Sequence, residues 1–382
     1  MANQPVRHLV AETLKELADL MEGHFRKVSV CVTTIGSEHG PTEVLRGAEL
    51  AEKRFPFVRV ILVGPATSTR LPLVEADSEK EAHEKMVNLL VDGEVDAAVT
   101  MHYDFPMGTA TVGRLIAPGT GREMLVATTT GMMASHRVAA MIKNAVAGLA
   151  VAKTLGITKP SVGLLNVDGA VQVQRALSDL KARGYEFEWA TSCRQDGGPL
   201  MRGNDVLVGT PDVLVCDTLS GNLLVKLLSA MTTGGTYETT GFGYGPGVGE
   251  DFTSYIGIVS RASGASVIAN AIGYVGQMVS GDLVSQVREE YTKANQCGLT
   301  GILGRFSTPE TKNENIAPPP MKVPATREIR GIDVLAIEDA VREVWKSGIF
   351  ASLGMGCTGP VIMVADGDEE VARSILKEKG YL

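Results

Sequence analysis

The sequence lacks several features that would point to a function directly. Aromatic residues make up only 5% of the 382 residues, and no run of Lys and Arg occurs. The chain has 36 Lys and Arg against 44 Asp and Glu, a formal net charge of −8. Proteins that wrap nucleic acid carry basic patches, so this composition argues against a nucleic-acid partner. No uncharged apolar stretch reaches the length of about 18 residues that a membrane span requires, so none is expected.

Cysteine is scarce, and neither cysteine nor histidine forms a metal motif. The five cysteines include no CxxC pair, and the six histidines form no HxH or HExxH group. A zinc site has no ligand pattern, and neither a metal nor a cofactor is expected. An odd, sparse set of thiols in a large acidic chain is typical of the cytoplasm. Residues 8–24 have the spacing of an amphipathic helix rather than of a signal peptide.

Glycine, by contrast, is abundant. The 43 glycines and 17 prolines indicate many tight loops. Short apolar runs alternate with amphipathic stretches between these loops, which predicts an α/β fold with a largely parallel sheet. The predicted strands are 28–32, 58–63, 96–100, 123–128, 161–166, 186–190, 213–217, 254–260 and 360–365. The predicted helices are 8–24, 42–53, 79–91, 136–155, 170–183, 222–231, 263–276, 337–345 and 368–379.

The composition also divides the chain. Residues 1–305 carry the regular alternation and are expected to form a two-lobed core. Residues 306–330 are rich in proline and polar residues, which is typical of a linker. Residues 331–382 are expected to form a small α/β appendage with a glycine loop at 354–359. The glycine-dense stretch 234–249 is interpreted as a mobile loop able to act as a lid.

The glycine loop of the appendage contains Cys357. Its glycines fit GxGxxG, but a dinucleotide motif follows a strand and opens a helix, whereas this loop precedes an apolar strand. The functional interpretation is a nucleophilic thiol. Small neighbours let a carbonyl approach the sulfur, and the N–H groups of Gly356 and Gly359 can stabilise a thiolate and an oxyanion. The structural alternative is a buried cysteine that acts as a small hydrophobic residue.

Three strand–turn–helix junctions offer helix N-termini that can hold phosphate. They contain Gly221 with Asn222, His39 in a glycine-rich turn, and Ser263. Ordinary helix caps and a structural histidine are the competing explanations. Lys226, one turn further along, is either a phosphate partner or a solvated side chain.

Two other segments that follow strands carry weaker signals. His102 and Asp104 invite an acid/base interpretation. Arg261 precedes Ser263 and offers a cation to an anion, with a helix cap again as the alternative.

Four segments of the core resemble the phosphate acyltransferases of phospholipid synthesis. The resemblance covers about residues 28–290 and implies the two-lobed, three-layer fold of isocitrate and isopropylmalate dehydrogenases, with the site in the cleft between the lobes. The sequence departs from that family at 100–105 and at 217–219, where the acyltransferases have Ser-Ala-Gly-Asn-Thr-Gly and Asp-Gly-Phe. The segments that carry the resemblance are 35–41 with 47–48, 159–166, 211–217 with 221–226, and 263–266 with 270–272.

The appendage is foreign to those acyltransferases. A core of this kind followed by the Cys357 loop resembles the α subunits of component C of glycine, sarcosine and betaine reductase complexes. In that family a cysteine of this loop carries an acetyl group, which implies that role for Cys357.

The resemblance also implies partners and a reaction class. Component B activates the amine, and the selenoprotein component A carries the two-carbon unit as a carboxymethyl selenoether. This chain, with a ketoacyl-synthase-like β subunit, forms the acetyl thioester from which phosphate releases acetyl phosphate. The implied assembly is a cytoplasmic oxidoreductase of the reductive-deamination type.

Three other functions stay open at this point. The chain could be a stand-alone phosphate acyltransferase or phosphotransacetylase, or a non-catalytic scaffold subunit. A nicotinamide-dependent dehydrogenase is disfavoured, because the sequence has neither an Asp-rich metal cluster nor a suitable dinucleotide loop. Fold alone does not choose among these functions.

Overall fold

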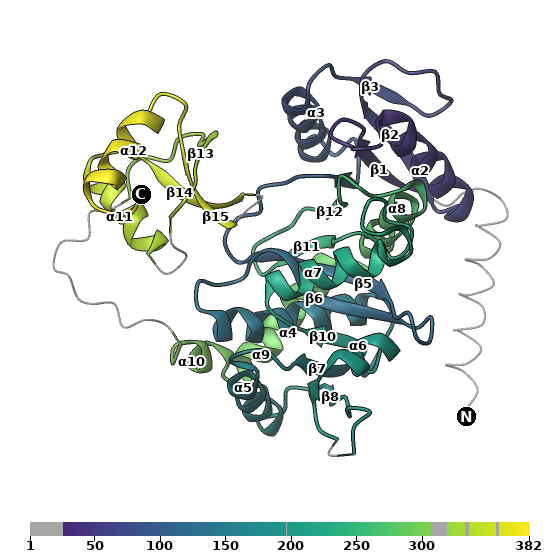
Figure 1. The fold of residues 1–382 in the computed structure, drawn as a ribbon, viewed down its shortest axis with the longest axis vertical. Coiled ribbons are helices and arrows are strands. Elements are labelled where there is room, and N and C mark those ends of the chain that lie inside the picture. The colour runs from purple at the N-terminus through teal and green to yellow at the C-terminus, as the bar shows by residue number, and fades with distance from the viewer. Residues whose placement is uncertain (1–25, 196, 307–318, 333–335, 357–358) are drawn as a thin grey trace, which may run out of the picture.

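The structure is a computed structural model that describes residues 26–195, 197–306, 319–332, 336–356 and 359–382. Figure 1 shows a large α/β body and a smaller body formed by the C-terminal elements, which we call the appendage. The predicted helix at 8–24 and the residue Cys357 lie outside the described residues. The prediction of an α/β fold with a large, mostly parallel sheet is confirmed.

Five parallel strands form the first lobe of the large body, in the order β3-β2-β1-β4-β12. Val30 and Val32 pack with helices α2 and α8, whereas Cys31 points to the opposite face and packs with α3. Because helices cover both faces, the strands are almost continuously apolar. The elements are β1 (Val28–Thr33), α2 (Pro41–Arg54), β2 (Val58–Gly64), β3 (Leu73–Glu75), α3 (Glu79–Val91), β4 (Ala97–Thr100), β12 (Ile256–Ile258) and α8 (Ala265–Ser280).

The second lobe continues the sheet in the order β11-β5-β6-β10-β7-β8, with β9 paired to β7. Its alanine-rich helix α4 is buried along most of its length and packs against β6 and β10. The strands are β5 (Thr109–Ile116), β6 (Glu123–Met132), β7 (Ser161–Leu165), β8 (Glu188–Trp189), β9 (Leu200–Met201), β10 (Val213–Val215) and β11 (Gly245–Gly249). The helices are α4 (Arg137–Thr154), α5 (Ala170–Ala182), α6 (Gly203–Val208), α7 (Thr218–Ser229), the 3₁₀ turn η1 (Met231–Thr233), α9 (Leu283–Gln296) and α10 (Leu299–Leu303).

The strand β11 joins the two lobes into one sheet, because it pairs antiparallel with β12 on one side and with β5 on the other. The interpretation of 234–249 as a mobile lid is therefore wrong for its last five residues, which are all buried. The glycines of this strand allow its backbone to pack closely against β5, because a Cβ on Gly245 would lie 1.8 Å from the Val112 carbonyl oxygen.

The strands of the two lobes run in opposite directions. β11, β5 and β6 are successive antiparallel neighbours, so the parallel set β6-β10-β7 opposes the parallel set of the first lobe. The carboxyl ends of the two sets consequently lie at opposite edges of the sheet. We call the edge where β1, β4 and β12 end the first-lobe edge.

The appendage is a small antiparallel sheet, in the order β13-β15-β14, with two helices. It has a hydrophobic cluster of its own, which includes Ile329, Val344, Ile362 and Leu376. The structure differs from the sequence prediction here. β13 begins inside the stretch expected to be a linker, and most of the expected glycine loop is a hairpin in which Gly356 pairs with Gly359. The elements are β13 (Arg327–Ile329), α11 (Ile337–Lys346), β14 (Ala351–Gly356), β15 (Gly359–Val364) and α12 (Glu369–Glu378).

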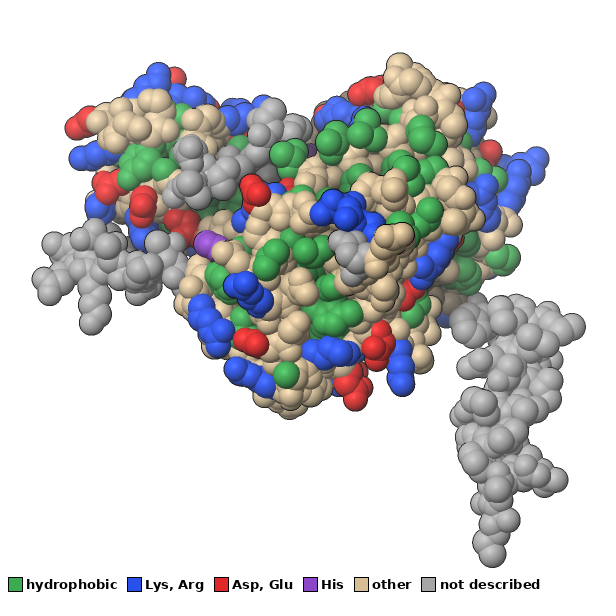
Figure 2. Space-filling view, turned by 60° about the horizontal axis from the view of Figure 1, so that its bottom comes forward, with side chains coloured by type: hydrophobic (Ala, Val, Ile, Leu, Met, Phe, Trp, Pro, Cys, Tyr) green, Lys and Arg blue, Asp and Glu red, His purple; other side chains and the backbone are tan. Residues whose placement is uncertain are grey.

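Two further features concern the helices and the surface of the described residues. Within the described ranges, the longest apolar helices fall short of what is needed to cross a membrane. Figure 2 shows Lys and Arg interspersed with Asp and Glu on the face it presents, and a notch between the appendage and the rest of the molecule.

Candidate active site

Polar side chains gather at the first-lobe edge, where β1, β4 and β12 end. Thr33 and Thr100 are buried side by side, and the Thr33 hydroxyl donates to Thr100 Oγ1 at 2.9 Å. The Val259 N–H donates to the Thr100 carbonyl at 3.0 Å, so the segment that follows β12 and contains Ser260 continues beside the end of β4. In open α/β sheets ligands bind outside the carboxyl ends of parallel strands, which makes this edge the first place to look for a site.

A cavity of about 1000 Å³ lies between this edge and the appendage, and we call it the appendage cavity. The core contributes the ends of β1 and β4 and the start of α3, and the appendage contributes β13 and β15. Its lining includes Thr33, Thr100, His102, Asp104, Arg327 and Met363. Met363 packs against Gly354 of the facing strand, where a Cβ would lie only 2.7 Å from the Met363 side chain. The base of the hairpin β14–β15 is therefore a wall of the cavity.

Two histidines of the cavity have shifted pKa values. His102 Nε2 lies 3.2 Å from Asp104 Oδ1, and this hydrogen bond raises the pKa of His102 above its usual value. His83 packs against the Tyr103 ring, and burial lowers the pKa of His83. The cavity wall therefore contains His102, whose environment favours the protonated imidazole, and His83, whose environment favours the neutral one.

A second group of polar side chains, the Lys226 cluster, consists of Lys226, Glu238, Ser260 and Ser263. Lys226 Nζ lies 2.9 Å from Ser260 Oγ and 3.2 Å from Glu238 Oε1. Glu238 is fully buried and accepts a hydrogen bond of 2.7 Å from Ser263 Oγ. Lys226 belongs to α7 of the second lobe, so the cluster ties that helix to the first-lobe edge. The Lys226 side chain is 37% exposed, which leaves its ammonium accessible to an anion.

Arg261 stands between the Lys226 cluster and the appendage cavity. Its Nη2 donates to Glu79 Oε1 at 2.8 Å. A Cβ on Gly36, which has φ +103°, would lie 3.0 Å from that same oxygen and 3.7 Å from Arg261 Nη1. The loop after β1 therefore packs closely against the Glu79 and Arg261 side chains, and a glycine at position 36 permits this contact.

The structure brings His39 and Ser263 together near α8. The His39 ring lies 4.9 Å from the Tyr237 ring, and the Tyr237 hydroxyl donates to Glu43 at 2.5 Å. Glu43 also accepts the Ala265 N–H at 2.8 Å, so a carboxylate already occupies the first turn of α8. Neither His39 nor Ser263 lines the appendage cavity as far as the structure describes it.

Gly221 and Asn222 lie elsewhere, in the first turns of α7. This helix begins at Thr218 rather than at 222, because Asp217 is its N-cap and accepts the Ser220 N–H at 3.1 Å. The Gly221 N–H donates to the Asp217 carbonyl, and the Asn222 amide donates to the Thr129 carbonyl at 3.1 Å. A Cβ on Gly221 would lie 1.9 Å from the Thr128 carbonyl oxygen, so this glycine lets α7 pack directly on β6.

The four described cysteines are poorly suited to act as a nucleophile at this edge. Burial raises the pKa of Cys31 to about 12, and burial also raises the pKa of Cys216 far above its usual value. A hydrogen bond to Asp205 raises the pKa of the exposed Cys193. Cys297 lies at the end of α9 in the second lobe, where its thiol is 3.4 Å from the Arg183 carbonyl.

Sequence patterns missed much of this edge. Glu238 stood in a glycine-rich stretch without a recognisable motif, and the contact between Thr33 and Thr100 joins residues 67 positions apart. A signal for Lys226 was present, because it lies one turn into the helix that the sequence predicts from residue 222. Its pairing with the buried Glu238 could not be predicted, because it depends on the segment after α7 crossing to the first lobe.

Comparisons with known proteins found a family model, curated relatives and a solved structure that this chain resembles. The family model described as fatty acid synthesis protein matches residues 28–363. The glycine/sarcosine/betaine reductase complex component C subunit alpha of Peptoclostridium acidaminophilum is 46% identical over 382 residues and is covered to 99%, as is this chain. The phosphate acyltransferase of Thermotoga petrophila is 30% identical over 236 residues, which cover 53% of this chain and 68% of the relative. A branched-chain phosphotransacylase structure from Enterococcus faecalis V583 matches with a TM-score of 0.47 and 16% identity, over 66% of this chain and 99% of the other.

Proposed function

The chain belongs to the family of α subunits of glycine/sarcosine/betaine reductase component C, and from this premise we propose that Cys357 carries an acetyl group that is released to phosphate. The Cys357 thiolate holds the acetyl group as a thioester. An oxygen of phosphate attacks the thioester carbonyl, the C–S bond breaks, and the thiolate leaves with the electron pair. The products are acetyl phosphate and free Cys357, so the transfer itself requires no oxidant or reductant.

The observation that carries this proposal is the position of the hairpin that flanks Cys357. Gly354 of β14 and Met363 of β15 line a cavity that also borders Asp104 and Phe105 of the loop after β4, and Met363 lines the appendage cavity as well. Along the hairpin, Gly356 lies two positions from Gly354. Its partner Gly359 lies four positions from Met363. At about 3.3 Å per residue, these separations are about 7 and 13 Å along the strands, so Gly356 and Gly359 lie within about 13 Å of residues that line these cavities. Gly356 and Gly359 remain our candidates for the N–H groups that stabilise the oxyanion.

Phosphate requires a local cation, because the chain as a whole is acidic. Lys226 supplies one at the first-lobe edge, and Arg261 supplies another beside it. We propose that phosphate binds between the Lys226 cluster and the appendage cavity, with His39 and Ser263 as flanking groups. Gly221 and Asn222 act on this site through the placement of α7, which carries Lys226.

The proposal includes the assembly in which the chain works. The Peptoclostridium acidaminophilum relative is a subunit of a multi-component complex, so we propose partner subunits here as well. In this scheme a ketoacyl-synthase-like β subunit and the selenoprotein component A deliver the two-carbon unit, component B activates the amine, and the complex is a cytoplasmic oxidoreductase of the reductive-deamination type. We also propose that the two lobes follow the isocitrate and isopropylmalate dehydrogenase arrangement.

Isotopic labelling tests the acetyl thioester. The chain is incubated with its β subunit and isotopically labelled acetyl phosphate, and its peptides are analysed by mass spectrometry. We expect an added acetyl mass on the Cys357 peptide that disappears when phosphate or arsenate is supplied. Label confined to another residue or to the β subunit would refute the role of Cys357 and favour a scaffold function. Turnover of coenzyme A thioesters without any partner would favour a stand-alone phosphotransacetylase.

Substitution of Lys226 tests the phosphate site. We expect Lys226→Met to raise the KM for phosphate about 10- to 100-fold, because a charge-assisted hydrogen bond to the anion is lost. Loss of this cation also leaves the buried Glu238 carboxylate without its ion pair, which destabilises the fold. The double variant Lys226→Met/Glu238→Gln removes both charges and separates the two effects. A wild-type KM in the double variant would contradict a phosphate role for Lys226, and Lys226→Arg should retain most of the affinity.

A further inference from the structure

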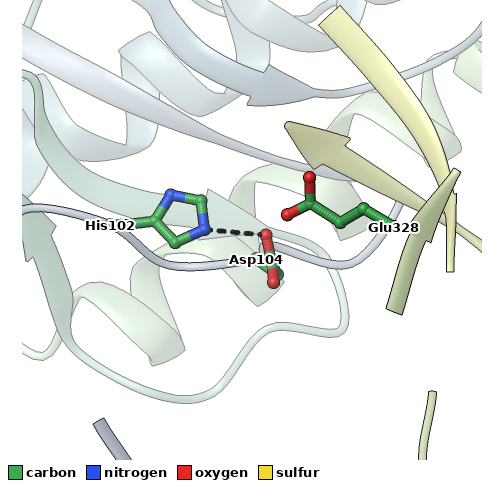
Figure 3. Close-up of side chains that lie close together, drawn as sticks. All are labelled: His102, Asp104 and Glu328. Carbon is green, nitrogen blue, oxygen red and sulfur yellow. Dashed lines mark ion pairs between the residues drawn. The ribbon is translucent and has the colours of Figure 1, made fainter. Parts of the chain in front are cut away.

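Three possible metal ligands meet where the appendage contacts the core. His102 and Asp104 belong to the loop after β4, and Glu328 belongs to β13 of the appendage (Figure 3). Their ligand atoms all lie within 4.8 Å of one another. We propose that His102, Asp104 and Glu328 form a site for one divalent transition-metal ion, and that this ion fastens the appendage to the core.

The distances between these donors suit such an ion. His102 Nε2 and Asp104 Oδ1 are 3.2 Å apart, close to the separation of about 3.3 Å between two ligands on a tetrahedral ion with bonds of about 2.0 Å. Because no pair of donors is more than 4.8 Å apart, a point between them lies at most about 2.8 Å from each. A rotamer adjustment of less than about 1 Å per side chain therefore brings all three to bonding distance.

The chemistry of the donors selects the class of metal. One imidazole nitrogen with two carboxylate oxygens suits zinc, manganese or iron(II) better than calcium or magnesium, which prefer oxygen alone. Three protein ligands leave at least one coordination position open. His102 and Asp104 line the appendage cavity, so this position is accessible to water or to an anionic ligand.

The surroundings hold the ligands and balance their charge. Arg330 Nε donates to Glu328 Oε2 at 2.8 Å and its Nη2 lies 2.6 Å from the same oxygen, which fixes the orientation of this carboxylate. Hydrogen-bonded carboxylates of this kind are usual around metal centres. Arg261 and Arg327, two further cations nearby, are paired with Glu79 and with Asp366, respectively. Arg330 thus places one positive charge against the two carboxylates of Asp104 and Glu328.

The fold explains why no sequence motif marks this site. Two ligands come from the core and the third from the appendage, more than two hundred residues later. The ion would link two separate hydrophobic clusters, one that includes Phe105 and one that includes Ile329. Its binding would thus fix the base of the hairpin β14–β15 against the first-lobe edge.

Metal titration of the full chain tests the site. Protein freed of metal by a chelator is titrated with Zn²⁺ and with Co²⁺ at neutral pH, and binding is followed by calorimetry and by the visible absorption of Co²⁺. We expect one site for which the two metals compete, and at least about a 10-fold loss of affinity in each of His102→Gln, Asp104→Asn and Glu328→Gln. The matched control is His83→Gln, which alters the same cavity and should leave the affinity unchanged.

The proposed role of the ion in holding the appendage against the core is tested by a separate measurement. Amide hydrogen exchange in Arg327–Ile329 should slow when the wild-type chain is saturated with Zn²⁺, and should not respond in Glu328→Gln. The proposal would be overturned if all three ligand variants kept the wild-type metal affinity, or if His83→Gln lost as much affinity as they do. It would also be overturned if amide exchange in the wild-type chain did not change on addition of Zn²⁺. None of these measurements involves turnover. Failure of the acetyl-transfer proposal would therefore leave the result for this site intact, and Cys357→Ser should still bind the ion.

Discussion

Cys357→Ser is expected to abolish phosphorolysis, with acetyl phosphate formation reduced at least about 10³-fold, because removal of the nucleophile removes the covalent intermediate. A serine hydroxyl has a far higher pKa than a thiol and is a poor leaving group, so an oxygen ester formed on the substituted side chain would not turn over at a useful rate. The measurement is acetyl phosphate formation by the chain combined with its partner subunits, together with the circular dichroism spectrum and Tm of the variant. The fold should be unaffected, since the substitution is nearly isosteric.

The control for this variant is Cys193→Ser. Cys193 is exposed, and the Cys193 N–H donates to Asp205 Oδ1, a bond that serine retains. We expect Cys193→Ser to have wild-type activity. More than about a tenth of wild-type turnover in Cys357→Ser would show that another group carries the acetyl unit.

Gly221→Ala is expected to destabilise the protein by about 3 kcal/mol, which is a large effect for one methyl group. The added Cβ would lie 1.9 Å from the Thr128 carbonyl oxygen and 3.0 Å from the Cys216 sulfur. Backbone does not yield as a flexible side chain does, so α7 must move away from β6. Calorimetry should show a Tm lower by several degrees, and the KM for phosphate should rise because α7 carries Lys226.

The matched control is Gly301→Ala in α10. A Cβ at Gly301 has no neighbour within 4 Å, and the residue lies inside a helix. Alanine favours helix over glycine by about 1 kcal/mol, so this variant should be as stable as the wild type or slightly more stable. If Gly221→Ala matched Gly301→Ala in Tm, the close contact between α7 and β6 would be refuted.

Sequence patterns predicted the first lobe well and the junction between the lobes poorly. Val30 and Val32 belong to an apolar run bounded by turn residues, which is a local signal that needs no knowledge of the rest of the chain. The strand β11 has the sequence Gly-Pro-Gly-Val-Gly, which has none of the β-branched pattern of a strand. It forms a strand because β5 and β12 supply its hydrogen-bonding partners, and glycine permits the close approach to Val112.

The candidate site shows the same division. The His102 and Asp104 signal was visible in a few consecutive residues, as was the position of Lys226 after a strand–helix junction. The partners of these side chains were not visible. Glu238 reaches Lys226, and Glu328 approaches Asp104, only through chain crossings that no local spacing encodes. The glycine loop suggested a nucleophilic thiol at Cys357 and the resemblance implied its acetyl group. Both stay predictions, because the residue lies outside the described part of the chain.

The strand order also constrains how the chain emerges from the ribosome. β1 to β4 are synthesised first, but β12 and α8, which complete the first lobe, follow the whole sheet of the second lobe in sequence. Until β12 at 256–258 has been made, β4 has an unpaired edge, and until α8 ends at residue 280 the apolar face of α2 lacks its partner. The second lobe forms its sheet from one continuous segment, although its helices α9 and α10 follow later. A nascent chain halted between the two lobes therefore exposes a half-built parallel sheet, the kind of intermediate that depends on chaperones.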